Sequence, residues 1–162
     1  MSTPSPIEHY DTESQLITSY LDSFRDQAIS IVSGFADDAV RASQLKSGWT
    51  PLELLKHLCC VERRWLVWGF LGEVVAEPWG DWRDDRWFVA SELSLTDVVL
   101  ELRTQGQRTS DIFASFSLED IGQPSERWEG KPAPALRRIG YHLIQEYARH
   151  LGHLDLVAEM RL

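Results

Sequence analysis

The amino-acid sequence predicts an all-α protein that folds as a four-helix bundle. Apolar residues recur at helical intervals in four stretches, no segment alternates like a half-buried strand, and segments rich in proline, glycine and charge separate the stretches. The chain has 162 residues, 43% of them hydrophobic, which suits one domain with a buried core. We therefore expect a single bundle domain over residues 1–162, with longer connections between helices two and three and between helices three and four.

The first helix is predicted over residues 9–34. Its apolar side chains recur in alternating steps of four and three, as in the seam of a bundle helix: Ile17, Leu21, Phe24, Ala28, Ile31 and Phe35. Gly34 is a residue type that commonly ends a helix. The pattern therefore places one face of this helix against the core.

The second helix is predicted to begin at the sequence "TPLE". Thr50 can cap the helix, Pro51 suits its first position, and Glu53 completes a capping box. Cys59 and Cys60 are neighbours on this helix and point too far apart for an easy disulfide. Two reduced thiols agree with a cytoplasmic location.

The third and fourth helices follow two irregular segments. The third follows "SLTD", and its bundle-like apolar positions are Leu95, Val99, Leu102, Thr109, Phe113 and Phe116. Gly106 weakens the middle of this helix. The fourth helix is predicted to run from near Pro134 to Met160. The segments "EPWGDWRDDRW" and "GQPSERWEGKPAP" break the periodicity, so we expect them to be ordered connections.

Charge and composition exclude several classes of protein. With 25 acidic and 16 basic residues, the net charge of -9 disfavours binding to nucleic acid or anionic lipid. The longest apolar runs are far shorter than the ~20 residues needed to cross a bilayer. The first residues, "MSTPSPIEHYD", resemble no secretory signal. We therefore expect a cytoplasmic protein without nucleic-acid or membrane partners.

The segment "HLIQEYARHLGH", residues 142–153, holds three of the chain's five histidines. Residues four apart on a helix lie one turn apart on the same face, so Glu146 and His150 share a face. His142, Arg149 and His153 lie on the same polar strip. It borders an apolar strip formed by Leu143, Tyr147, Leu151, Leu154 and Ala158. Because the polar strip lies beside the predicted core, it is a candidate site.

A further histidine, His57, is predicted to point inward from the second helix. Its helix face also carries Leu54, Val61, Trp65 and Trp68. If helices two and four face each other, His57 could meet Glu146 and His150. Two imidazoles and one carboxylate can hold a divalent metal and leave a coordination position open. From helical geometry alone, a core histidine and an exposed Glu146–His150 pair remain the alternatives.

The segments "SGWTPLELLKHLCCVERRWL" and "HLIQEYARHLGHLDLVAE" resemble the DinB-like superfamily of metal-dependent four-helix bundles. Within it they are similar to the branch that includes mycothiol-dependent maleylpyruvate isomerase and other mycothiol S-transferases. The resemblance implies metal ligands at His57, Glu146 and His150. Many relatives carry histidine at the middle position, so Glu146 is typical of the mycothiol branch. The likeness is close for helices two and four and loose for helix one.

The resemblance implies a metal-dependent thiol S-transferase in which His57, Glu146 and His150 act through the bound metal. A divalent ion, zinc by expectation and nickel as the alternative, favours the thiolate of mycothiol or a related small thiol for attack on an electrophile. Two other functions stay open. One is a metal-dependent hydrolase, in which water replaces the thiol. The other is a non-catalytic bundle for binding or homodimerisation.

Several other residues have a functional and a structural interpretation. Arg149 and His153 are candidates for cofactor binding, but a salt bridge and a surface position are the alternatives. His142 has the same alternatives as His153. Cys60 could ligate a metal as a thiolate, although a small buried hydrophobic side chain is the commoner role. Three tryptophans could wall a pocket or pin their loop to the bundle: Trp79, Trp82 and Trp87.

Overall fold

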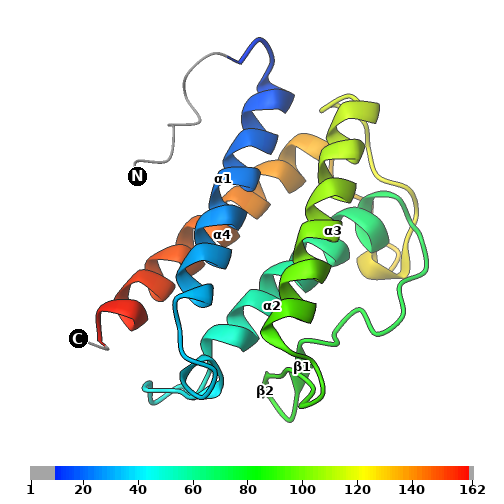
Figure 1. The fold of residues 1–162 in the computed structure, drawn as a ribbon. Coiled ribbons are helices and arrows are strands. Elements are labelled where there is room, and N and C mark those ends of the chain that lie inside the picture. Colours follow the sequence, from blue (N-terminus) through cyan, green and yellow to red (C-terminus); the bar gives the residue numbers. More distant parts are fainter. Residues whose placement is uncertain (1–9, 161–162) are drawn as a thin grey trace.

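The computed structural model describes residues 10–160, and its architecture is the predicted all-α four-helix bundle (Figure 1). The main helices are α1 (Glu13–Ser33), α2 (Pro51–Glu62), α3 (Leu95–Ser115) and α4 (Leu136–Glu159). A π-helical segment, η2 (Arg63–Phe70), continues α2. The shorter elements are the 3-10 helices η1 (Ala39–Arg41) and η3 (Glu126–Trp128) and the strands β1 (Trp82–Arg83) and β2 (Arg86–Trp87).

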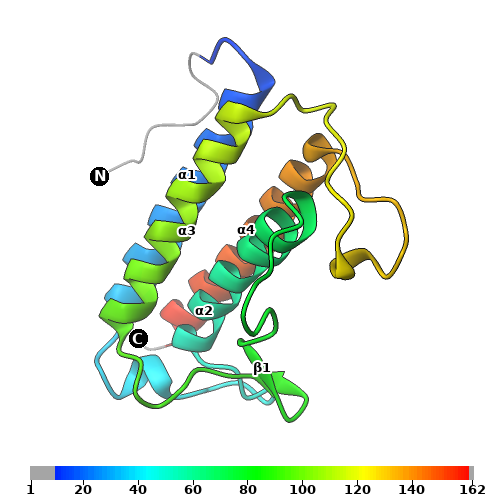
Figure 2. The same cartoon turned by 90° about the vertical axis from the view of Figure 1, so that its right-hand side faces the viewer.

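The bundle is built so that α1 and α2 each pack against both α3 and α4. Helices α1 and α4 run in one direction, and α2 and α3 run in the opposite direction (Figure 1, Figure 2). Because α2 and α3 are parallel, the chain must return along the bundle between them, and residues 71–94 make this return. The small β1–β2 hairpin belongs to this connection and lies against α2.

Capping boxes fix the first turns of three helices, because a threonine or serine and a residue three positions later exchange hydrogen bonds with the backbone. The pairs are Thr12 with Gln15 in α1, Thr50 with Glu53 in α2, and Ser94 with Asp97 in α3. The predicted start of α2, with Pro51 in its first turn, is confirmed. Helix α1 begins at Glu13, later than predicted, and His9 lies outside the described residues.

The end of α3 and one small sheet also differ from the prediction. Phe116 is not helical, because it caps α3 in an extended conformation. Helix α4 begins at Leu136, close to the predicted start near Pro134, and the Leu136 amide donates to the carbonyl of Asp120 instead of to a side-chain cap. The β1–β2 hairpin was not predicted, since two residues per strand are too few to show an alternating pattern.

A buried polar network joins the four helices. Glu62 of α2 is fully buried and accepts hydrogen bonds from Arg25 of α1, Thr109 of α3 and Tyr147 of α4. Arg25 Nη2 lies 3.1 Å from each carboxylate oxygen. Gly106 of α3 makes room for this guanidinium, because a Cβ at Gly106 would lie 2.6 Å from Arg25 Cζ. The glycine that weakens α3 therefore has a packing role.

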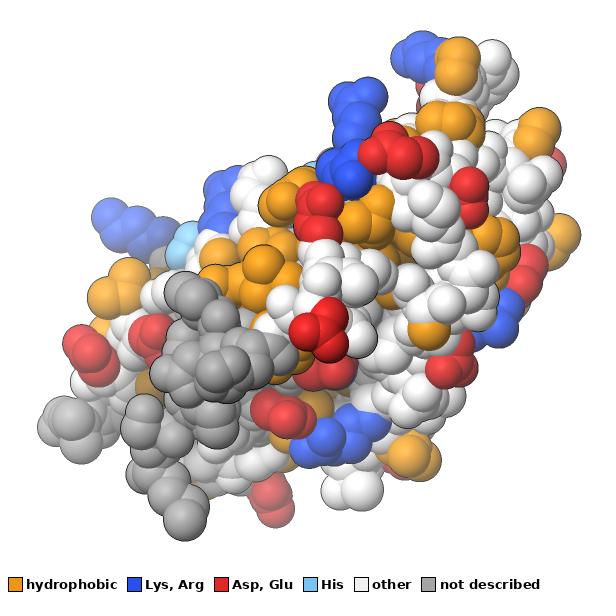
Figure 3. Space-filling view, turned by 90° about the horizontal axis from the view of Figure 1, so that it is seen from above, with side chains coloured by type: hydrophobic (Ala, Val, Ile, Leu, Met, Phe, Trp, Pro, Cys, Tyr) orange, Lys and Arg blue, Asp and Glu red, His pale blue; other side chains and the backbone are white. Residues whose placement is uncertain are grey.

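The connection from α3 to α4 is pinned to η2. Trp128 donates from Nε1 to the carbonyl of Gly69 at 2.9 Å, and Ser125 donates from its hydroxyl to the carbonyl of Trp68 at 2.6 Å. A Cβ at Gly69 would lie 2.7 Å from the Trp128 ring, so the two segments touch at this glycine. Seen from above, the molecule shows acidic, basic and hydrophobic side chains mixed over its surface (Figure 3). None of the helices within residues 10–160 is long and apolar enough to cross a membrane.

Candidate metal centre

Three predicted ligands, His57 of α2 and Glu146 and His150 of α4, come together between these helices. One potential ligand atom from each residue lies within 4.8 Å of the other two. Glu146 Oε2 is 3.3 Å from His150 Nε2 and 3.9 Å from His57 Nε2. Ligand atoms around one tetrahedral ion lie ~3–4 Å apart, so only a small closure of the side chains is needed to bind an ion.

The donor set is partly accessible. The side chains of His57, Glu146 and His150 are 14%, 22% and 9% exposed. Two imidazoles and one carboxylate are donors that zinc and similar divalent ions prefer, and a set of three leaves room for a further ligand. The residues present therefore fit a catalytic type of metal site better than a closed structural one.

The carboxylate of Asp81 holds His57 from behind. It lies 2.9 Å from His57 Nδ1, and its side chain is only 2% exposed. Arg64 of η2 in turn donates hydrogen bonds to both Asp81 oxygens and, at 3.2 Å, to the carbonyl of Pro78. When Nδ1 donates its proton to Asp81, Nε2 is the ring nitrogen that faces Glu146, and it can ligate a cation after losing any proton of its own. Such a carboxylate–histidine pair is the usual support behind a metal-ligating imidazole.

Hydrogen bonds and burial set the protonation of these groups. His150 first, and His57 second, hold the pKa of Glu146 well below its ordinary value of 4.5. Burial opposes the charged form of His57 most strongly, but Asp81 and Glu146 outweigh it and raise the pKa of His57 above 6.5. Burial likewise works against the Asp81 carboxylate, yet its bonds from His57 and Arg64 lower its pKa below 3.8. Two ionised carboxylates thus favour positive charge at this point.

His150 has one nitrogen free. Its Nδ1 atom is buried and has no hydrogen-bond partner within residues 10–160, while Nε2 faces Glu146. Its ring stands edge-on to the His57 ring, with 5.0 Å between the ring centroids. A buried imidazole nitrogen without a partner is uncommon in a core that serves packing alone.

Tryptophan rings wall one side of the cluster. Trp87, at the end of β2, stacks on His57 with ring centroids 4.4 Å apart and meets the His150 ring edge-on at 5.3 Å. The ring centroid of Trp49, just before α2, lies 5.9 Å from that of Trp87 and 6.2 Å from that of His153. The hairpin therefore brings an apolar surface to the imidazoles, which limits the access of water from this side.

The other two histidines of the strip flank the cluster in different ways. His142 Nε2 lies 3.5 Å from Glu146 Oε1, and the His142 ring packs on Trp65 with 4.0 Å between centroids. The His153 ring lies 5.5 Å from the His150 ring. Each is therefore next to one of the three converging residues, but neither belongs to the converging group within residues 10–160.

Four further candidates lie apart from the cluster. Arg149 is exposed. Cys60 is fully buried, and burial raises the pKa of its thiol, which favours the neutral form of a small hydrophobic side chain. Trp79 and Trp82 are about half exposed, at 51% and 49%, and line a separate groove. Of the three loop tryptophans, Trp87 is the one that reaches the histidines.

Sequence reasoning missed Asp81 and its partner Arg64. Asp81 lies 24 residues after His57, in a connection whose irregular pattern gives no information about direction. The available signal was an acidic residue in a proline-, glycine- and tryptophan-rich segment that was predicted to be ordered. The contact depends on the path of the connection between η2 and α3, which brings Asp81 Oδ2 to 2.9 Å from His57 Nδ1.

Comparison with known proteins agrees with this architecture. The sequence model of the family described as Mycothiol-S-transferase matches residues 16–160, a range that contains His57, Asp81, Glu146 and His150. No curated protein matches the chain. The match covers most of the sequence, with α1 from Leu16 onward and the whole of α2, α3 and α4. The chain therefore belongs to the mycothiol-S-transferase family.

Proposed function

We propose that the protein is a metal-dependent thiol S-transferase that uses mycothiol or a related small thiol. His57, Glu146 and His150 would hold a divalent cation, zinc by preference, and the whole chain would act as one domain. The observation that carries the proposal is the convergence of these three side chains between α2 and α4. Membership of the mycothiol-S-transferase family supports the choice of thiol.

The surrounding residues suit this role. Asp81 engages Nδ1 of His57, so that Nε2 rather than Nδ1 faces the cluster. Ionised Glu146 and Asp81 lower the local potential and so favour a cation over an empty site. Trp87 covers the imidazoles and limits water on its side. When bound, a divalent cation would favour the thiolate form of a thiol whose ordinary pKa is ~8.5.

Metal content tests the ligand set. Freshly purified protein is expected to carry a divalent ion in equimolar amount, measured by plasma mass spectrometry. His150→Ala should lose this metal because it removes one donor of three. His153→Ala is the matched control for metal content, since it changes the same residue type on the same helix next to the cluster. Equal metal loading in the two variants would contradict the ligand assignment.

Thiol consumption tests the reaction. Wild-type protein should deplete mycothiol in the presence of electrophiles, and His150→Ala should not. Circular dichroism should show that the helices persist after chelation, because the apolar core of the bundle does not depend on an ion. Melting on chelation would indicate a structural metal instead. Cleavage of esters or amides without thiol consumption would indicate the hydrolase.

A further inference from the structure

A cationic and aromatic pocket lies next to the candidate metal centre. It has a volume of about 540 Å³ and lies between η2, the connection from α3 to α4, and the first turns of α4. Its charged lining is mostly basic, with Arg127, Lys131 and Arg138, although the whole chain carries a net charge of -9. Its aromatic lining is Trp65 and Trp128. A volume of this size suits a small organic molecule.

The basic side chains of this pocket lack salt-bridge partners among the described residues, although Glu129 attracts Arg127 at longer range. Within residues 10–160, Arg127, Lys131 and Arg138 form no salt bridge. Arg127 Nε is buried without a hydrogen-bond partner among the described residues. The guanidinium of Arg127 instead lies over Trp65 and Trp128, with 4.9 and 5.2 Å to the ring centroids. Positive charge held over aromatic rings without a salt bridge is an arrangement that suits an anion.

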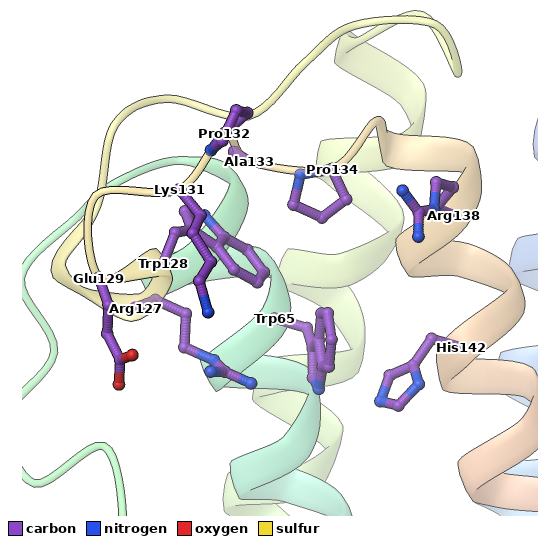
Figure 4. Close-up of a pocket in the computed structure, with 10 residues that line it drawn as sticks. All are labelled: Trp65, Arg127, Trp128, Glu129, Lys131, Pro132, Ala133, Pro134, Arg138 and His142. Atoms are coloured by element: carbon purple, nitrogen blue, oxygen red, sulfur yellow. The ribbon is translucent and has the colours of Figure 1, made fainter.

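Basic and acidic side chains lie on different sides of the pocket (Figure 4). Trp65 lies between Arg127 and His142, and the Lys131 side chain enters from the connection above. The acidic lining residue, Glu129, lies on the opposite side of Arg127 from Trp65 in this view. The space beside Trp65 therefore faces basic and aromatic groups.

The pocket is connected to the candidate metal ligands through one imidazole. His142 lines the pocket, packs on Trp65 and approaches Glu146 Oε1 at 3.5 Å. Arg138, His142 and Glu146 are spaced four residues apart on α4. With 1.5 Å of rise per residue, Arg138 and Glu146 are separated by about 12 Å along the helix. A molecule whose anionic end lies at Arg138 and whose planar body covers Trp65 would extend toward Glu146.

We propose that this pocket binds a planar organic anion that carries a carboxylate, held by Arg127, Lys131 and Arg138 and stacked on Trp65. This rests on the proposed function in one respect: the anion would be the electrophilic substrate that receives the thiol. The neutral alternative, an uncharged electrophile that uses the tryptophans alone, makes no use of the three basic side chains.

Binding of an unreactive probe tests the pocket without any catalysis. The probe is 4-nitrobenzoate, and 4-nitrobenzamide is its neutral match; both are titrated against tryptophan fluorescence. The carboxylate should bind more tightly than the amide by about tenfold, a difference typical of hydrogen bonds to a charged group. Arg138→Gln should weaken the binding of 4-nitrobenzoate by about threefold or more and leave the binding of 4-nitrobenzamide unchanged. Arg103→Gln removes the same charge from an exposed position on α3 and is the control.

The results separate the pocket from the proposed function. Equal binding of carboxylate and amide, or equal losses of carboxylate affinity in Arg138→Gln and Arg103→Gln, would overturn the anion site.

The reaction is followed with mycothiol and 4-(chloromethyl)benzoate or its amide. Sulfur bonds to the benzylic carbon, chloride leaves with the bonding electrons, and the thiol proton goes to solvent. Selective binding of the carboxylate without thiol consumption from any electrophile would keep the site and refute the transferase. Selective binding with faster turnover of the carboxylate supports both.

Discussion

The sharpest test of the packing concerns Gly106. Replacing glycine by alanine inside a helix ordinarily stabilises the helix by about 1 kcal/mol. Here the new Cβ would lie 2.6 Å from Arg25 Cζ and Nε, a separation that side chains do not tolerate. The guanidinium would have to shift, and losing its contact with Glu62 would cost about 3–5 kcal/mol, as for other disrupted buried ion pairs. We therefore expect Gly106→Ala to lower the free energy of unfolding by about 2–4 kcal/mol, the difference between the two effects.

Urea unfolding followed by circular dichroism measures this change on metal-free protein. The corresponding fall in melting temperature is about 4–16 °C for a chain of this size. Gly152→Ala is the matched control, because Gly152 also lies within a helix but a Cβ added there would have nothing within 4 Å of it. This control should be stabilised by up to about 1 kcal/mol. If both variants were stabilised alike, the reasoning about Arg25 and Gly106 would be refuted.

Three other predictions follow from the structure. The Glu13 carboxylate, bonded chiefly by Arg137, has its pKa lowered from 4.5, so its stabilising effect is present above pH 4.5 and is lost as the pH falls through the lower folded-state pKa. Urea midpoints of wild type and Glu13→Gln should therefore differ at pH 7 and converge on acidification; a constant difference would contradict the linkage. Asp81→Asn replaces the carboxylate behind His57 with a neutral amide that has a single acceptor oxygen, and it should weaken metal binding by about 10- to 100-fold, measured by competition with a chromophoric chelator. Unchanged affinity would show that Asp81 does not support the ligand. Tyr147→Phe removes a donor from the buried carboxylate of α2 and should cost about 1–3 kcal/mol in urea unfolding, while a neutral result would mean that the remaining donors suffice.

Local signals in the sequence were enough for most of the helices. The capping box at Thr50 predicted the first turn of α2 correctly, because its hydrogen bonds join residues three positions apart. The start of α1 was placed too early, since its apolar seam begins only at Ile17 and periodicity alone does not show where a helix starts. The hairpin was missed because two residues per strand are too few to show an alternating pattern.

The candidate site was predictable only in part. Helical spacing placed Glu146 and His150 on one face, but their approach to His57 depends on which helices pack together. Nothing in a single sequence fixes that pairing, and the family resemblance supplied it. Asp81 could not be found in this way, because its contact with His57 depends on the path of an irregular connection. Likewise, Gly106 looked like a weakness until the position of Arg25 was known.

The connection formed by residues 71–94 contacts the His57 ring on both its edge and its face. Asp81 holds the edge of the imidazole ring, and Trp87 covers the face of the same ring. Substitutions in this short segment can therefore change the basicity, tilt and hydration of a ligand without altering any ligand. Diversification of reactivity among related proteins would then be expected to proceed through this loop, while the two helices that supply the donors keep their sequence.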